Sequence, residues 1–209
     1  MGTYLSSGWD FAAARAAGNL RVIKVDATRL LRLTRFPKTE PYWGKGQAYR
    51  FDDPAQVYGA TDTALHMEVA FAETILHQKG YFTGGQWVID EANILERHIV
   101  TYMRPAKPNL LVADFIGTML KALGLNNDLC SSDDYTESMA VSSTLHAQLP
   151  DLDGIMYVSR QMNTGLAVAL FERSEVELGS TITRLIDHLD YDNLLSVFNV
   201  AILPSGRAP

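Results

Sequence analysis

The order of strand-like and helix-like segments is the feature that most constrains how this chain folds. Apolar patterns typical of strands cover residues 29–35, 84–89 and 110–113, whereas helical spacing marks residues 62–79 and 132–148. A doubly wound parallel sheet requires the two kinds of segment to alternate regularly. They do not alternate here, so the sequence predicts an α+β fold.

Residues 62–79 form the clearest predicted helix. Its apolar residues recur at a spacing of three or four and make one stripe: Leu65, Val69, Ala72 and Leu76. Thr61 or Asp62 is placed to cap its N-terminus, and Gly80 follows its end. A shorter Ala-rich helix is expected at residues 10–17.

The C-terminal half predicts a hairpin between two further helices. Residues 132–148 form the first of these helices, and residues 154–159 and 165–171 form strands joined by a short turn. Residues 182–189 are expected to form a final amphipathic helix, followed by an edge strand at 199–203.

Composition narrows the classes of function. The 209 residues include 18 Lys or Arg and 24 Asp or Glu, and a chain with a net charge of −6 is not expected to bind nucleic acid directly. The single cysteine, Cys130, excludes an internal disulfide and a cysteine-based metal cluster. The five histidines show no metal-ligand spacing, so no metal is expected. Motifs for a Rossmann site, a P-loop, a zinc protease and a nucleophile elbow are absent.

Targeting signals and domain boundaries also bear on the prediction. The first 20 residues lack the basic segment and apolar run of a secretory signal, and no apolar stretch is long enough to span a bilayer. We therefore expect a cytoplasmic protein with no membrane partner. One domain is expected over residues 29–203, with an N-terminal extension at 1–28 and a flexible tail at 204–209. The sequence leaves a homodimer open.

Several polar residues stand in apolar surroundings. Arg32 interrupts the first strand, Arg50 ends a loop rich in aromatic and turn residues, and Ser159 ends the first strand of the hairpin. Glu73 and Glu68 lie roughly 60° and 80° from the centre of the apolar stripe, on opposite flanks, so only one is expected to face a given pocket. Taken singly, each residue also has an ordinary explanation as an exposed or turn position.

Local strings in the chain resemble one known family. They are LLRL at 30–33, YWG at 42–44, RFDDP at 50–54, FAET at 71–74, DGIMYVSR at 153–160 and AVALFER at 167–173. In order and spacing they resemble the RES domain, a family named for Arg, Glu and Ser, over most of the chain.

The resemblance implies a fold and an activity. RES proteins are toxins of toxin–antitoxin pairs and related effectors, with a compact α+β domain similar to ADP-ribosyltransferase toxins and a cleft between β-sheets. Known members degrade NAD by hydrolysis or phosphorolysis of the nicotinamide–ribose bond. The resemblance therefore implies NAD as substrate, no metal or other cofactor, and a cognate antitoxin or immunity protein that blocks the cleft.

The resemblance also assigns residues. It places catalytic residues at Arg32, Arg50, Glu73 and Ser159, with Glu68 as the alternative carboxylate. The carboxylate is expected to stabilise positive charge on the ribose as the bond breaks, the arginines to hold the pyrophosphate, and the serine to fix the substrate by a hydrogen bond. Further substrate contacts are expected from Tyr42, Tyr49, Tyr58, Arg160 and Asn163.

One position departs from the family pattern and keeps alternatives open. The family often has Tyr in the strand before the glutamate helix, where the ungapped match gives Asp62, with Tyr58 nearby. One alternative function is transfer of ADP-ribose to a macromolecule, and another is a non-catalytic NAD-binding module, which Asp62 favours. The acceptor (water or phosphate) and delivery into a target cell's cytoplasm as an effector also stay open.

Overall fold

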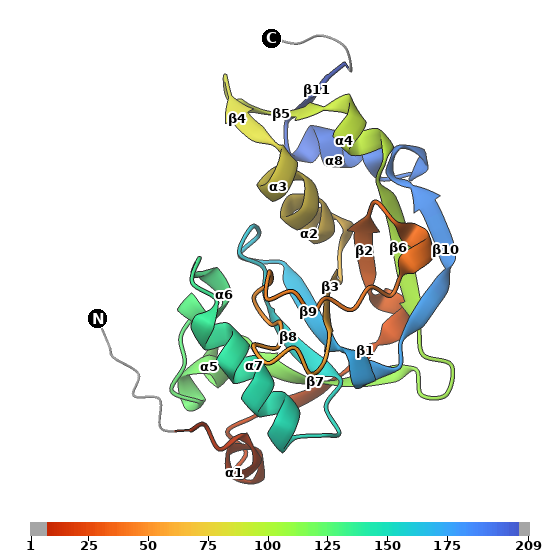
Figure 1. Ribbon diagram of the computed structural model, residues 1–209. Helices are drawn as coiled ribbons and strands as arrows, with labels where there is room; N and C mark the ends of the chain where they lie inside the picture. The colour runs from red at the N-terminus through yellow and green to blue at the C-terminus, as the bar shows by residue number, and fades with distance from the viewer. Residues whose placement is uncertain (1–7, 205–209) are drawn as a thin grey trace.

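An eight-stranded mixed sheet forms the centre of the computed structural model, which describes residues 8–204 (Figure 1). Its strand order is β1-β7-β8-β9-β3-β2-β6-β10, with β7 and β8 parallel and the other neighbours antiparallel. The strands are β1 (Val22–Asp26), β2 (Leu31–Thr34), β3 (Ala60–Ala64), β6 (His98–Met103), β7 (Asn109–Phe115), β8 (Gly154–Val158), β9 (Leu166–Phe171) and β10 (Glu177–Arg184).

A second sheet and several short helices complete the fold. The small sheet has the order β11-β5-β4 and contains β4 (Tyr81–Thr83), β5 (Gln86–Asp90) and β11 (Val200–Leu203). The helices are α1 (Phe11–Ala16), α2 (Met67–Phe71), a π-helical turn (Ala72–Leu76), α3 (His77–Lys79), α4 (Glu91–Leu95), α5 (Thr118–Ala122), α6 (Asp128–Ser131), α7 (Thr136–Gln148) and α8 (Tyr191–Val197). Helices α1, α5, α6 and α7 gather beside β7 and β8, and the others lie near the small sheet (Figure 1).

The large sheet is nearly divided between β2 and β3. These strands share a single residue pair, Leu31 opposite Ala64. On their outer sides β2 pairs along its whole length with β6, and β3 pairs along its whole length with β9. The two halves of the sheet therefore diverge from the Leu31–Ala64 pair, and a cleft lies between them. This arrangement confirms the predicted α+β fold, and the cleft lies between the two halves of one sheet.

The core covers both faces of the large sheet. Along β9, Ala167, Ala169 and Phe171 pack into one apolar cluster, and Val168 and Leu170 pack into the other. Successive side chains of a strand point to opposite faces, so a strand covered on both sides needs apolar residues throughout. This explains why residues 165–171 read as an unbroken apolar segment.

The predicted hairpin of β8 and β9 and the edge strand β11 are confirmed. The predicted helix at 62–79 is wrong at its start, because residues 60–64 pair with β9 and the helix begins only at Met67. Thr61 and Thr63 are β-branched and suit a strand, so sheet pairing prevails over the capping signal at that point.

Two other helix predictions need correction. Residues 182–184 end β10 and pair with β6, and residues 185–187 form a single 3-10 turn, so the helix expected at 182–189 is absent from the described part of the chain. The β-branched run from Thr181 to Thr183 favours the strand. Helix α7 begins at Thr136, four residues later than predicted.

The chain ends contribute unequally to the described structure. Within the predicted extension, α1 confirms the helix expected at residues 10–17. Strand β1 pairs with β7 at the edge of the large sheet. Residues 1–7 of that extension and 205–209 of the predicted tail lie outside the described residues. Between residues 8 and 204, none of the helices has the length and apolar character needed to cross a membrane.

Candidate active site

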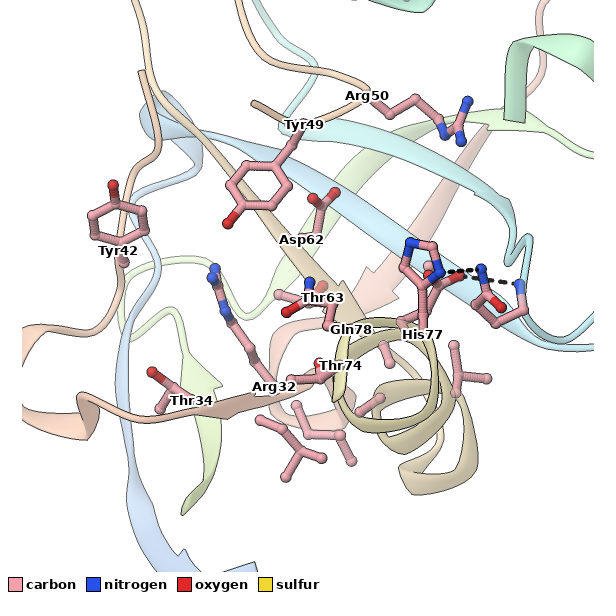
Figure 2. Close-up of a pocket in the computed structure, with 18 of the residues that line it drawn as sticks. Arg32, Thr34, Tyr42, Tyr49, Arg50, Asp62, Thr63, Thr74, His77 and Gln78 are labelled. Carbon is pink, nitrogen blue, oxygen red and sulfur yellow. Dashed lines mark hydrogen bonds between the residues drawn. The ribbon is translucent and has the colours of Figure 1, made fainter. Parts of the chain in front are cut away.

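A cavity of about 760 Å³ occupies the cleft between β2 and β3 (Figure 2). Its walls come from these two strands, from the loop at residues 35–50, from the π-helical turn and from the residues that follow β8. Cavities of several hundred Å³ are typical of small-molecule sites. Polar side chains from distant parts of the chain converge here, so this cavity is the candidate active site.

Glu73 and Ser159 form the most closely defined contact at this site. Glu73 lies in the π-helical turn and lines the cavity. Ser159 follows β8, is only 2% exposed, and its Oγ donates a hydrogen bond of 2.5 Å to Glu73 Oε1. The same Oγ accepts hydrogen bonds of 3.1 Å from the backbone N–H groups of Gln161 and Met162. A hydroxyl that already accepts twice directs its single proton toward the carboxylate, which fixes Glu73 at the wall.

The alternative carboxylate, Glu68, lies outside the cavity lining. It belongs to the regular α2 turn, whereas Glu73 follows in the wider π-helical turn. Such turns occur often at functional sites, because they re-aim a side chain without ending the helix. The helix geometry thus separates the two glutamates, and only Glu73 reaches the cavity.

Arg32 projects from β2 into the cleft (Figure 2). Its Nη1 donates to Thr61 Oγ1 on β3, and its Nε lies 3.7 Å from Glu40 Oε1. The guanidinium also lies 6.0 Å from the centre of the Tyr42 ring. Arg32 therefore bridges the two half-sheets at the floor of the cavity.

Arg50 lines another side of the cavity (Figure 2). Its Nη1 donates to the carbonyl oxygens of Leu129 at 3.2 Å and Ser132 at 2.9 Å, and the guanidinium lies 4.7 Å from the Tyr135 ring centre. These contacts satisfy carbonyls at and just after α6. Arg50 thus anchors α6 to the cavity wall.

Asp62 introduces a further carboxylate from β3 (Figure 2). Tyr157, at the end of β8, donates its hydroxyl to Asp62 Oδ1 at 3.3 Å. Burial raises the pKa of Asp62 to about 6, against the attraction of Arg32 and with a smaller contribution from the charge of Glu73. Its protonation therefore changes close to neutral pH.

Three of the predicted substrate contacts line the cavity. Tyr42 and Tyr49 are 51% and 42% exposed at its rim, and Arg160 lies beside the end of β8. The Arg160 guanidinium forms an ion pair with the exposed Asp133. The two tyrosines offer exposed aromatic faces for a flat ligand.

The other two predicted contacts lie elsewhere. Tyr58 is buried, its hydroxyl shares a hydrogen bond of 3.0 Å with Ser142 Oγ, and its ring stacks on His146 with centroids 3.7 Å apart. Asn163 is exposed in the turn between β8 and β9 and is not part of the cavity lining. The structure corrects the expectation for Tyr58, which is buried away from the cavity, and places Asn163 outside the cavity lining. Tyr58 belongs to the core between α7 and β9.

Sequence reasoning missed several lining residues: Arg35, His77, Arg97, Cys130, Tyr135 and Tyr157. Tyr157 lies inside the DGIMYVSR string and could have been found there, whereas Arg97 carries no local signal.

Burial raises the pKa of the Cys130 thiol to about 12, which excludes a reactive thiolate at neutral pH. Within residues 8–204, no group of three or more His, Cys, Asp or Glu side chains is arranged to hold a metal ion.

The RES domain model matches residues 26–192, which is most of the chain. The chain belongs to the RES domain family. No curated protein matches it. Its fold is similar to that of a chain in the crystal structure of the M. tuberculosis MbcT–MbcA toxin–antitoxin complex, with a TM-score of 0.60 at 16% identity over 90% of this chain and 98% of that one.

In this RES domain, the Arg, Glu and Ser positions carried over from the family meet at one site. Arg32 and Glu73 line the same cavity, and Ser159 is bonded to Glu73 behind its wall. They come from β2, the π-helical turn and the end of β8, so only the folded sheet brings them together.

Proposed function

We propose that this RES domain is a toxin that degrades NAD by cleaving the nicotinamide–ribose bond. The observation that carries this proposal is the Glu73 carboxylate, held by Ser159 at the wall of a cavity that Arg32 also lines. The family membership supports the same chemistry, and the cavity volume is in the range of small-molecule sites.

The reaction needs one well-placed carboxylate. When the bond between ribose C1′ and the nicotinamide nitrogen breaks, its electron pair moves onto the nitrogen, and the cationic ring leaves as neutral nicotinamide. Positive charge develops on the ribose, as in other glycosyl transfers. The acceptor oxygen then bonds to C1′ and loses its proton. A fixed negative charge at Glu73 stabilises the ribose cation more than the ground state, and no general acid is needed for the leaving group.

The other residues position the substrate. Arg32 offers a guanidinium for a phosphate of the dinucleotide, and Tyr42 and Tyr49 offer exposed rings for a base. Ser159 acts through Glu73 and is a positioning residue, since its hydroxyl proton is already committed to the carboxylate. Arg50 acts through α6, whose carbonyls it holds.

We further propose that a cognate antitoxin or immunity protein restrains this activity in the cytoplasm. The similar solved structure is a complex of a toxin with an antitoxin. In this chain the cavity rim carries exposed aromatic side chains: Phe36, Tyr42 and Tyr49. A partner seated on that rim would exclude NAD from the cavity.

The test is NAD consumption by the purified chain, with and without inorganic phosphate and with products resolved by mass. We expect wild type to consume NAD and Glu73→Gln to lose at least about 100-fold in rate. Glu68→Gln is the matched control, because it changes the same residue type outside the cavity. Free ADP-ribose as product would identify water as the acceptor, and ADP-ribose phosphate would identify phosphate.

Other outcomes would contradict the proposal. A label transferred from NAD to a macromolecule would indicate an ADP-ribosyltransferase. A thermal shift with NAD but no turnover would indicate a binding module, and Asp62 would then be the residue to restore to Tyr. Equal rates for Glu73→Gln and wild type would exclude the assigned role of the carboxylate.

A further inference from the structure

Arg97 is a buried cation that lines the cavity without a partner. Its side chain is 6% exposed, and its Nε is buried without a hydrogen bond. Across the described residues 8–204, its guanidinium forms no ion pair and no hydrogen bond. The neighbouring Arg35 also lines the cavity, and its Nε is likewise buried and unsatisfied.

The strand register explains why these two arginines lie together. Along the β2–β6 ladder the last pair is Thr34 opposite His98. One further step along both strands brings Arg35 opposite Arg97. Like charges directly opposite each other on paired strands are destabilising. Burial, and then the charge of Arg35, lower the pKa of Arg97 from its usual value.

The acidic residues nearby are already engaged with other cations. Glu96 Oε1 pairs with Arg35 Nη2 at 2.5 Å, and Glu40 accepts from the Tyr102 hydroxyl at 2.9 Å while facing Arg32. Among residues 8–204, Glu96 attracts the Arg97 charge without a direct ion pair, and no carboxylate contacts the Arg97 guanidinium. A buried, unpaired charge costs considerable free energy, so a bound anion would be strongly favoured there.

We propose that Arg97 and Arg35 form an anion subsite at the β2–β6 end of the cavity, and that it binds a phosphoryl group. Guanidinium groups match phosphate oxygens with planar, paired donors. The source of the phosphoryl group, inorganic phosphate or a phosphate of the dinucleotide, rests on the proposed function. The binding site itself rests on the two arginines and the cavity.

Such a subsite also gives the cavity a direction. Asp62 and Glu73 line it from β3 and the π-helical turn, whereas Arg97 lines it from the β6 end. Carboxylates attract a cationic ring and arginines attract phosphate. NAD carries both, so the charges orient it with nicotinamide at Glu73 and its phosphates toward Arg97.

Isothermal titration calorimetry with inorganic phosphate and with ADP-ribose tests the subsite, at constant ionic strength because charge contacts are screened by salt. For Arg97→Met we expect binding of at least one of these ligands to weaken about tenfold or more. Arg184→Met is the matched control, since Arg184 is exposed, pairs with Asp187 and lies outside the cavity lining. It should bind both ligands like wild type.

The two ligands distinguish the sources. Weaker binding of inorganic phosphate would assign the subsite to the free anion. If inorganic phosphate does not bind to wild type and only ADP-ribose binding weakens, the subsite takes a phosphate of the dinucleotide. Unchanged affinity for both ligands in Arg97→Met would overturn the proposal.

A second variant covers the case in which Arg97→Met does not fold. Arg35→Met changes a half-buried residue, and the same loss of affinity is expected from it. Because neither titration requires turnover, the result is separate from the NAD assay. An active enzyme with unaltered ligand affinity in both variants would refute the subsite alone, and altered affinity in an inactive protein would refute only the proposed function.

Discussion

The Ser159 hydroxyl and the Glu73 carboxylate are joined by a hydrogen bond of 2.5 Å between positions 86 residues apart in the chain. Gln161 N–H lies 3.4 Å from the same carboxylate oxygen. The turn after β8, whose Gln161 also lines the cavity, therefore holds the π-helical turn in place. The orientation of the proposed catalytic carboxylate depends on this turn as much as on its own helix.

Removing the hydroxyl of Ser159 should impair turnover more than binding. In Ser159→Ala we expect kcat for NAD cleavage to fall about 10- to 100-fold with KM changing much less, because Glu73 loses its orientation. Steady-state kinetics measure this split. Ser142→Ala is the control, since Ser142 is also buried and bonded to the Phe51 carbonyl but lies away from Glu73. An equal loss of kcat in both variants would indicate a general effect on folding.

Asp62 should make stability depend on pH in an unusual direction. Its pKa is raised from 3.8 to about 6 in the folded protein, so between these values the fold holds a proton that the unfolded chain has lost. The contribution of Asp62 to the free energy of unfolding is fully present below about pH 4, and it is lost as the pH rises through 6. Asp62→Asn should therefore raise the free energy of unfolding by about 1–3 kcal/mol at pH 7.5 and by little at pH 4.

Urea unfolding at the two pH values measures the effect of Asp62→Asn. Asp192→Asn is the control, because Asp192 is an exposed residue of α8, and a change within about 0.5 kcal/mol is expected at both pH values. A stabilisation by Asp62→Asn that is the same at pH 4 and pH 7.5 would contradict the assigned titration.

Replacing Arg50 should lower the free energy of unfolding more than replacing Arg32. Arg50→Met leaves the carbonyls of Leu129 and Ser132 without their donor, and we expect about 2–4 kcal/mol of destabilisation. Arg32→Met should cost about 1 kcal/mol and mainly raise KM, because this side chain is less buried and faces the cleft. Unfolding curves and kinetics on both variants test the contrast, and equal stabilities would refute it.

Gly154 is required by the close approach of two strands. A Cβ at this position would lie 2.2 Å from the carbonyl oxygen of Ala169 on β9. We expect Gly154→Ala to destabilise the protein by about 2–4 kcal/mol, because the β8–β9 ladder must shift. Gly46→Ala, where no atom lies within 4 Å, should stay within about 1 kcal/mol of wild type. Thermal unfolding of both variants is the measurement, and similar melting temperatures would contradict the steric argument.

The sequence predicted the parts of the fold that depend on local patterns. Apolar runs and turn residues located the β8–β9 hairpin. The order of the short motifs that resemble the RES domain located Glu73 and Ser159. The sequence pattern assigned the end of β3 and the end of β10 to helices, because strand pairing with β9 and β6 overrides the local helical signals there. Arg97 was not predictable, because only the β2–β6 register brings it next to Arg35. Tyr58 was misassigned, because its burial depends on stacking with His146 on distant α7.

The single pairing of Leu31 with Ala64 leaves the two halves of the sheet joined at one residue pair, at the place where a ligand would bind. A molecule that fills the cleft contacts β2 and β3 together. Its contacts therefore link the two strands where they do not pair with each other. Part of its binding free energy then opposes separation of the halves. Backbone amides of both strands should exchange with solvent more slowly, and in concert, when the cleft is occupied.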